Sequence, residues 1–195
     1  MSEFCISTQE AEGLFFDFDR RFYRSEFSLP LRSSSGYVVF EGRGYPIDAL
    51  ATRLEISGHH GGNLKEQFRG LGFRLLANEN WTEGEIALSC ALRHRMGWDR
   101  TLRASDPTVQ EFSRYLRELS PLHRLIPNHR STSSIQRKLD DIRTSRRDYH
   151  LRETRGGALT VRVAHLYDTD PRKVLRMARS AATANVPEQI NFLLD

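Results

Sequence analysis

The chain has 195 residues, of which 38% are hydrophobic and 28% are charged, and its net charge is +4. Eleven Phe, six Tyr and two Trp supply the apolar surface of a folded core, which argues against a disordered chain. No run approaches about eighteen apolar residues, and the first residues do not resemble a signal peptide, so we expect a soluble cytoplasmic protein in which Cys5 and Cys90 stay reduced.

Positive charge is concentrated in the last third of the chain. Residues 122–180 hold fourteen Lys and Arg against six Asp and Glu, a surplus of eight in a chain whose net charge is only +4. Nearly all of these cations are arginines, whose planar guanidinium can hold a phosphate or a guanine edge through two hydrogen bonds. A GC-rich gene would also favour arginine codons, so the argument depends on where the charge lies. Segregated basic charge indicates a surface that binds phosphates.

The first eighty residues predict an α+β module. A capping box at Ser7 begins a helix of about residues 8–24 that has apolar side chains on one face. A β-branched and aromatic run at residues 37–40 is followed by turn residues and Tyr45, which is typical of a β-hairpin. Further elements are expected to be helices at about 47–56 and 64–71 and a strand at 73–76.

The rest of the chain predicts helices. A second capping box begins at Thr82, with Trp81 before it, and Asp106 followed by a proline is typical of a helix N-terminus. Later helices are expected to begin at Ser131 or Thr132, at Leu159 and at Pro171. We therefore predict an α+β protein of two modules: a small module with a short β-hairpin or sheet and helices at 1–80, and a mainly helical basic module at 81–195.

The segment from Ser131 to Arg147 is the first candidate phosphate-binding element. The free N–H groups and the positive dipole end of a helix favour an anion, and Ser131, Thr132 and Ser133 stand at this end. The cations of the segment are Arg130, Arg137, Lys138, Arg143, Arg146 and Arg147. The alternative is an ordinary solvated basic helix with a serine cap. The basic flanking segments favour phosphate docking.

Residues 160–179 are the second candidate. Two short apolar-faced helices about a turn at residues 168–170 match the spacing of a helix-turn-helix. The cations on the exposed side of the second helix, which could reach base edges, would be Arg172, Lys173 and Arg176. Asp168 stands where glycine is usual and Thr169 where an apolar residue is usual, so a generic pair of helices is an equal alternative.

The sequence contains no recognisable catalytic, cofactor or metal-ligand motif. His59 and His60 are adjacent and have no Cys or acidic pair at ligand spacing, so a polar glycine loop is favoured over a metal site. Paired carboxylates one or two residues apart do not share a helix face. A divergent nuclease remains an alternative, and the residues it could use are Glu41, Asp48, Glu55 and His59.

The block from Gly36 to Leu76 carries a resemblance to a known family. A tyrosine-led strand, a turn with glycine and a basic residue, Tyr-Pro, an alanine-bearing helix, Gly-Gly and Leu-Gly-Phe follow in this order. The residues are Tyr37, Gly42, Arg43, Tyr45, Pro46, Ala49, Gly61, Gly62, Leu71, Gly72 and Phe73. This order resembles the amino-terminal head of McrA-like, modification-dependent HNH restriction endonucleases. Ile47 and Asp48 replace the basic residue usual after the proline, which leaves that turn without the family's cation.

Residues 81–149 also look like helical segments near the amino end of related HNH proteins. The matching residues are Trp81, Glu85, Leu119, Ser120, Arg130, Ser131, Ile135, Lys138 and Leu139. No part of the chain resembles the nuclease half of such proteins. The resemblance implies a DNA-recognition or accessory part of a restriction or defence system, with any cleavage supplied by another polypeptide.

We therefore expect a non-catalytic protein that binds double-stranded DNA, unmodified or modified, without a cofactor, a metal or a membrane. It would be a component of a restriction system, with a nuclease or another protein as partner, or a transcriptional regulator. The predicted DNA contacts are Arg130, Ser131, Thr132, Ser133, Arg137, Lys138, Arg146, Arg147, Arg172, Lys173 and Arg176. The alternatives are a divergent metal-dependent nuclease and a regulatory adaptor whose arginines bind an acidic protein.

Overall fold

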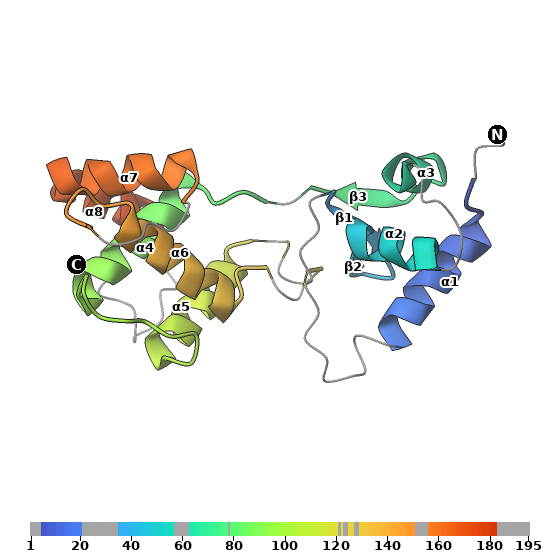
Figure 1. The fold of residues 1–195 in the computed structure, drawn as a ribbon, viewed down its shortest axis with the longest axis horizontal. Helices are drawn as coiled ribbons and strands as arrows, with labels where there is room; N and C mark the ends of the chain where they lie inside the picture. Colours follow the sequence, from blue (N-terminus) through green and yellow to red (C-terminus); the bar gives the residue numbers. More distant parts are fainter. Residues whose placement is uncertain are drawn as a thin grey trace. The chain divides into compact units, whose positions relative to one another are not determined.

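The computed structural model describes residues 5–20, 35–56, 63–77, 79–120, 122, 125–126, 129–150 and 156–182 (Figure 1). The chain divides into two compact units, the first formed by residues 1–79 and 122–128 and the second by residues 80–121 and 129–195. The first unit is α+β and the second is helical, so the predicted fold class is confirmed. Among the described residues, no helix has the length and apolarity needed to cross a membrane.

The first unit consists of a small antiparallel sheet and three helices. Its elements are α1 (Thr8–Phe18), β1 (Tyr37–Phe40), β2 (Arg43–Pro46), α2 (Ile47–Ile56), α3 (Leu64–Gly70) and β3 (Arg74–Leu76). The strand order is β2-β1-β3, and Tyr37 of β1 pairs with Pro46 on one side and with Leu76 on the other. The predicted hairpin and the predicted helix at 47–56 are confirmed. The predicted last turns of the first helix, residues 21–24, and the loop with His59 lie outside the described residues.

Aromatic packing holds the first unit together. The ring of Phe15 on α1 lies 4.8 Å from the rings of both Phe40 and Tyr45 and 5.6 Å from that of Phe68, measured between centroids. Phe15 itself is completely buried. Stacked and tilted aromatic pairs contribute about 0.5–1.5 kcal/mol each beyond the burial of their area, so α1 is fixed to the sheet and to α3 by one ring.

A segment distant in sequence completes the first unit. The backbone N–H of Gly44 on β2 donates a hydrogen bond of 2.7 Å to the carbonyl of Leu125. A Cβ atom at position 44 would lie 2.9 Å from that carbonyl oxygen, which is closer than real contacts allow. Glycine is therefore required there. Leu125 and Ile126 were predicted to belong to the helical module, whereas they lie against Gly44 at the open edge of β2.

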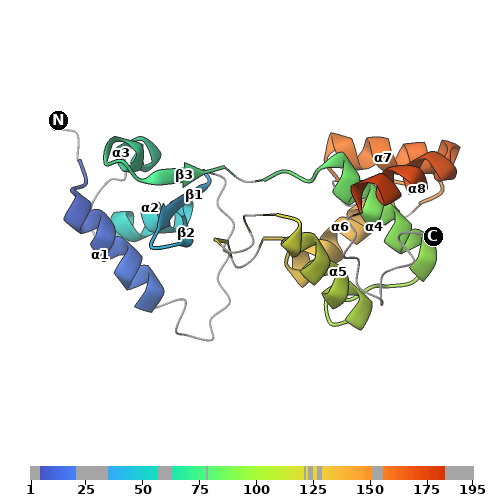
Figure 2. The ribbon, with the colours of Figure 1, turned by 180° about the vertical axis from the view of Figure 1, so that it is seen from behind.

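The second unit is built around one buried helix. Its elements are α4 (Glu83–Met96), α5 (Pro107–Glu118), α6 (Thr132–Thr144), α7 (Ala158–Thr169) and α8 (Pro171–Ala181). Helices α6, α7 and α8 all pack against α4, and every residue from Ile86 to Arg93 is buried. In both views α5 lies at the opposite end of this unit from α7 and α8 (Figures 1 and 2).

The predicted capping boxes form, whereas the predicted cap of α5 does not. The capping boxes at Ser7 and Thr82 both form: the cap hydroxyl accepts the backbone N–H of the glutamate three residues later, and that glutamate's carboxylate accepts the backbone N–H of the cap residue. Asp106, predicted to cap α5, makes no side-chain bond to that helix, because its carboxylate accepts the backbone N–H of Arg103 instead, at 2.9 Å. Pro107 at the first position of α5 lacks one of the N–H groups that a cap would satisfy.

Candidate nucleic-acid interface

The outer side of α8 carries four cations. Val174 and Ala178 are buried, whereas the exposed residues with positive charge are Arg172, Lys173, Arg176 and Arg179. Spacings of three and four residues place these four on one side of the helix. Within the described part of the chain, none of them forms an ion pair. We call these four residues the α8 basic face.

Helix α8 follows α7 almost without a turn. The turn predicted at residues 168–170 is wrong, because α7 continues through Thr169 and only Asp170 separates the two helices. The carboxylate of Asp170 accepts the backbone N–H of Lys173 at 3.0 Å, and Pro171 occupies the first helical position. This cap begins α8 at once. The connection is shorter than the three- or four-residue turn of a helix-turn-helix.

Arg147 lies beside the junction of α7 and α8. Its backbone N–H donates to a carboxylate oxygen of Asp168 at 2.9 Å, and its side chain is exposed. Asp168 lies in the last turn of α7, two residues before the cap of α8. The structure therefore brings two of the predicted contact residues, Arg147 and Arg172, to the same end of the second unit, although they come from different predicted segments.

Arg130, a predicted phosphate contact, is instead an internal residue. Its side chain is only 5% exposed, and its Nε and Nη2 atoms donate to the two carboxylate oxygens of Glu85 at 2.6 and 2.8 Å. Nη2 also donates to the carbonyl of Asn80, and the guanidinium lies 4.3 Å from the ring centroid of Trp81. A guanidinium with these partners links the residues before α6 to the start of α4 and is unsuited to binding DNA.

Lys138 joins the same cluster from α6. Its Nζ donates to the hydroxyl of Thr160 on α7 at 2.9 Å and lies 5.2 Å from the ring centroid of Trp81. The side chain is 9% exposed and lies 3.8 Å from a carboxylate oxygen of Asp141. Lys138 therefore joins α6 to α7 inside the unit. We call Trp81, Glu85, Arg130, Lys138 and Thr160 the Trp81 cluster.

Arg146 also has internal partners. Its Nε donates to Asp168 at 2.8 Å, its Nη2 lies 2.9 Å from Asp148, and its guanidinium stands 4.3 Å from the ring centroid of Trp98. The ring of Trp98 in turn lies 4.9 Å from that of Tyr167. Sequence spacing gave no sign of this cluster, since its members come from the residues after α4, the residues after α6, and α7.

The remaining predicted contacts lie at the start and on the outer side of α6. The Ser131 hydroxyl accepts the backbone N–H of Ser134, so it caps the helix as predicted. Ser133 is exposed, Thr132 is half-buried, and Arg137 is exposed. Of the cations predicted on this segment, Arg137 and Arg147 are thus the ones that reach solvent with their charged groups uncommitted in the described structure.

Comparison of the chain with protein-family models, with curated proteins and with solved structures found no match. The residues that carry the two resemblances described above can still be placed. Tyr37 and Tyr45 are core residues of the first unit, and Trp81, Glu85, Arg130 and Lys138 meet in the Trp81 cluster. In this chain these positions therefore build the fold.

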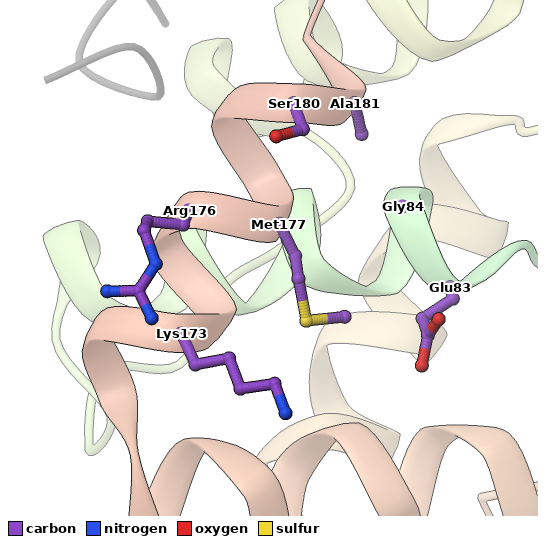
Figure 3. Close-up of a pocket in the computed structure, with 7 residues that line it drawn as sticks. All are labelled: Glu83, Gly84, Lys173, Arg176, Met177, Ser180 and Ala181. Atoms are coloured by element: carbon purple, nitrogen blue, oxygen red, sulfur yellow. The ribbon is translucent and has the colours of Figure 1, made fainter.

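A shallow depression lies where α4 crosses α8 (Figure 3). It has a volume of about 630 Å³ and is lined by Glu83, Gly84, Lys173, Arg176, Met177, Ser180 and Ala181. Two members of the α8 basic face thus share a surface hollow with one carboxylate. Sequence reasoning missed Glu83 because it lies about ninety residues from the cations that it faces.

Two exposed cations, one of the α8 basic face and one beside Glu83, were also absent from the predicted contacts. Arg179 lies one turn beyond Arg176, and a count of three residues along α8 would have found it. Arg162 on α7 forms a 2.9 Å ion pair with Glu83, and the two side chains are 67% and 49% exposed. Only the packing of α7 against α4 reveals this pair.

The carboxylates considered for a nuclease do not converge. Glu41 lies in the turn between β1 and β2, whereas Asp48 and Glu55 lie on α2. Seven residues of helix correspond to about 10 Å of rise, so Asp48 and Glu55 are too far apart to hold one metal ion. Among the described residues, no group of three His, Cys, Asp or Glu side chains could hold a metal. His59 lies outside the described residues.

The buried thiol of Cys90 offers no nucleophile at neutral pH. Burial, helped by the nearby Asp168 carboxylate and partly offset by Arg146, raises its pKa to about 12. A thiol with such a pKa stays protonated and unreactive.

The pairing of Glu85 with Arg130 predicts a loss of stability in acid. Burial alone would raise the Glu85 pKa, but hydrogen bonds from Arg130 and from the Thr82 backbone, with the Arg130 charge, lower it below 4.5. A carboxyl whose pKa is lower in the folded state stabilises the fold above its unfolded pKa and loses this effect as pH falls through the folded value. Replacing Glu85 by glutamine should therefore cost about 2 kcal/mol near neutral pH and much less in strong acid.

Urea unfolding followed by tryptophan fluorescence measures this difference. The chain has two tryptophans, and Trp81 and Trp98 both lie in the second unit, so the signal reports that unit alone. The control is Glu83→Gln, which removes an ion pair with Arg162 whose two side chains are 49% and 67% exposed, and it should change stability by less than about 1 kcal/mol at every pH. A cost of Glu85→Gln that does not shrink below about pH 4 would contradict the prediction.

Proposed function

We propose that this protein binds duplex DNA through the α8 basic face. The observation that carries the proposal is the presence of four exposed cations on one helix with no ion-pair partner among the described residues. Their helix is held to the unit by its opposite, apolar side, so the cations are presented on a rigid support. Arginines and lysines arranged in this way neutralise backbone phosphates and release counterions.

Two further cations of the second unit are also exposed. Arg147 stands at the junction of α7 and α8, and Arg137 is exposed on α6. Arg130, Lys138 and Arg146, in contrast, are left out of the proposed contacts because their charged groups already bind carboxylates, a hydroxyl or aromatic rings inside the unit. The proposal therefore involves about four to six phosphates, counted as one per exposed cation.

Binding to a random duplex should depend steeply on salt. With about four to six phosphates neutralised, the affinity is expected to fall about a hundredfold to a thousandfold between roughly 50 and 200 mM monovalent salt. Fluorescence anisotropy with a labelled duplex of about twenty base pairs measures the affinity at each salt concentration. A cytosine-methylated duplex and a phosphorothioated duplex of the same sequence test whether modification is recognised. An affinity that is indifferent to salt, or no binding at low salt, would refute the proposal.

A further inference from the structure

The depression at the crossing of α4 and α8 places a carboxylate among the proposed DNA contacts. A Cβ atom at Gly84 would lie 2.7 Å from the Cβ of Ala181, so the glycine allows α4 to approach α8 closely at this point. Glu83 precedes it and is thereby placed beside Lys173 and Arg176. Figure 3 shows Lys173 and Met177 extending toward the side of α8 on which Glu83 lies, whereas Arg176 extends the other way.

The carboxylate of Glu83 binds a cation of α7. The Nη2 atom of Arg162 on α7 donates to Glu83 Oε1 at 2.9 Å. Both side chains are half or more exposed, so water weakens the pair and its separation costs little. A phosphate and a carboxylate are both bound by the guanidinium fork, and the phosphate of DNA carries the stronger field of a polyanion.

Taking these contacts together, and resting on the proposed function, we propose that Arg162 and Lys173 form a subsite for one DNA phosphate and that the Glu83 carboxylate competes with the phosphate for it. When DNA binds, Arg162 leaves Glu83 and donates to the phosphate, while Lys173 approaches from α8. Glu83 then remains as an unpaired negative charge next to a polyanion, which lowers the affinity. The acidic residue therefore sets an upper limit on how tightly this face holds DNA.

The test is the full chain with Glu83→Gln, measured against the wild-type chain by anisotropy with the same random duplex. The amide cannot hold Arg162 as an ion pair, so we expect about fivefold to tenfold tighter binding near 100 mM salt. The slope of log affinity against log salt concentration should also become steeper by about one, which corresponds to one more phosphate contact. Glu111→Gln removes another Glu–Arg pair, on α5, whose carboxylate side chain is 13% exposed, and it should leave the affinity unchanged. Thermal unfolding of each variant checks that the second unit remains folded.

The same substitution in an Arg162→Gln background separates competition from a general charge effect. If Arg162 is the group released, Glu83→Gln should gain less than about threefold when Arg162 is absent, because only the lost repulsion remains. An equal gain in both backgrounds, or no gain from Glu83→Gln in a wild-type chain that binds DNA, overturns the subsite and leaves the proposed function standing. If the wild-type chain itself does not bind in a salt-dependent way, the proposed function fails, and the subsite fails with it.

Discussion

Replacing Arg93 by methionine should destabilise the second unit by about 3–5 kcal/mol, the largest effect on stability that we expect from one substitution. Arg93 lies on α4 with no exposed surface. Its guanidinium donates to the carbonyls of Leu139 and Arg100 at 3.0 and 2.7 Å and to the carboxylate of Asp140 at 2.8 Å. Methionine fills a similar volume but removes one donor from each of these three acceptors, and the buried part of each loses a partner that water cannot fully replace.

Two further variants show whether the hydrogen bonds or the charge of Arg93 matter. Arg93→Lys keeps the charge but cannot form three bonds in the fixed geometry of the guanidinium fork, so its cost should be only slightly smaller. Arg103→Met is the control, because Arg103 is exposed, and its cost should be within about 0.5 kcal/mol. Urea unfolding followed by tryptophan fluorescence measures all three. A cost of Arg93→Met below about 1 kcal/mol would show that the network is dispensable.

Replacing the four cations of the α8 basic face by glutamine should weaken DNA binding about a hundredfold to a thousandfold near 100 mM salt. Each lost phosphate contact should also reduce the slope of log affinity against log salt concentration by about one. Glutamine has nearly the helix propensity of arginine and lysine, and the buried residues Val174 and Ala178 remain, so the unit should stay folded. The measurement is anisotropy with the random duplex, together with the salt titration of the variant.

A matched variant separates the α8 basic face from net charge. Arg103 lies just before α5, and Arg114 and Arg117 lie on it. Their replacement by glutamine lowers the net charge of the chain from +4 to +1, and it is compared with the same replacement of Arg172, Arg176 and Arg179. Because α5 lies at the far end of the unit from α8 (Figures 1 and 2), this variant should bind nearly as tightly as the wild-type chain. Equal losses in the two variants would mean that DNA senses only net charge, and intact binding in the α8 variant would place the contacts elsewhere.

The cations show most clearly where sequence reasoning succeeded and where it could not. The basic character of residues 122–180 is a property of composition, and the amphipathic pattern of α8 depends only on residues within three helical turns, so both could be predicted. Arg130, Lys138 and Arg146 could not be told apart from Arg137 and Arg147 in the same segment. Their partners Glu85, Thr160 and Asp168 lie 45, 22 and 22 residues away.

The fold divides in the same way. The sequence by itself determined the capping boxes, the hairpin, the bounds of α2 and the helical character of the second unit, because caps, turns and apolar periodicity act over a few residues. Only the tertiary structure decided that residues around Leu125 join the sheet, that α7 runs into α8 through one residue, and which arginines are internal. Each of these depends on which helices and strands pack together. A buried guanidinium binds the acceptors that this packing places beside it, because an unpaired buried charge would destabilise the fold.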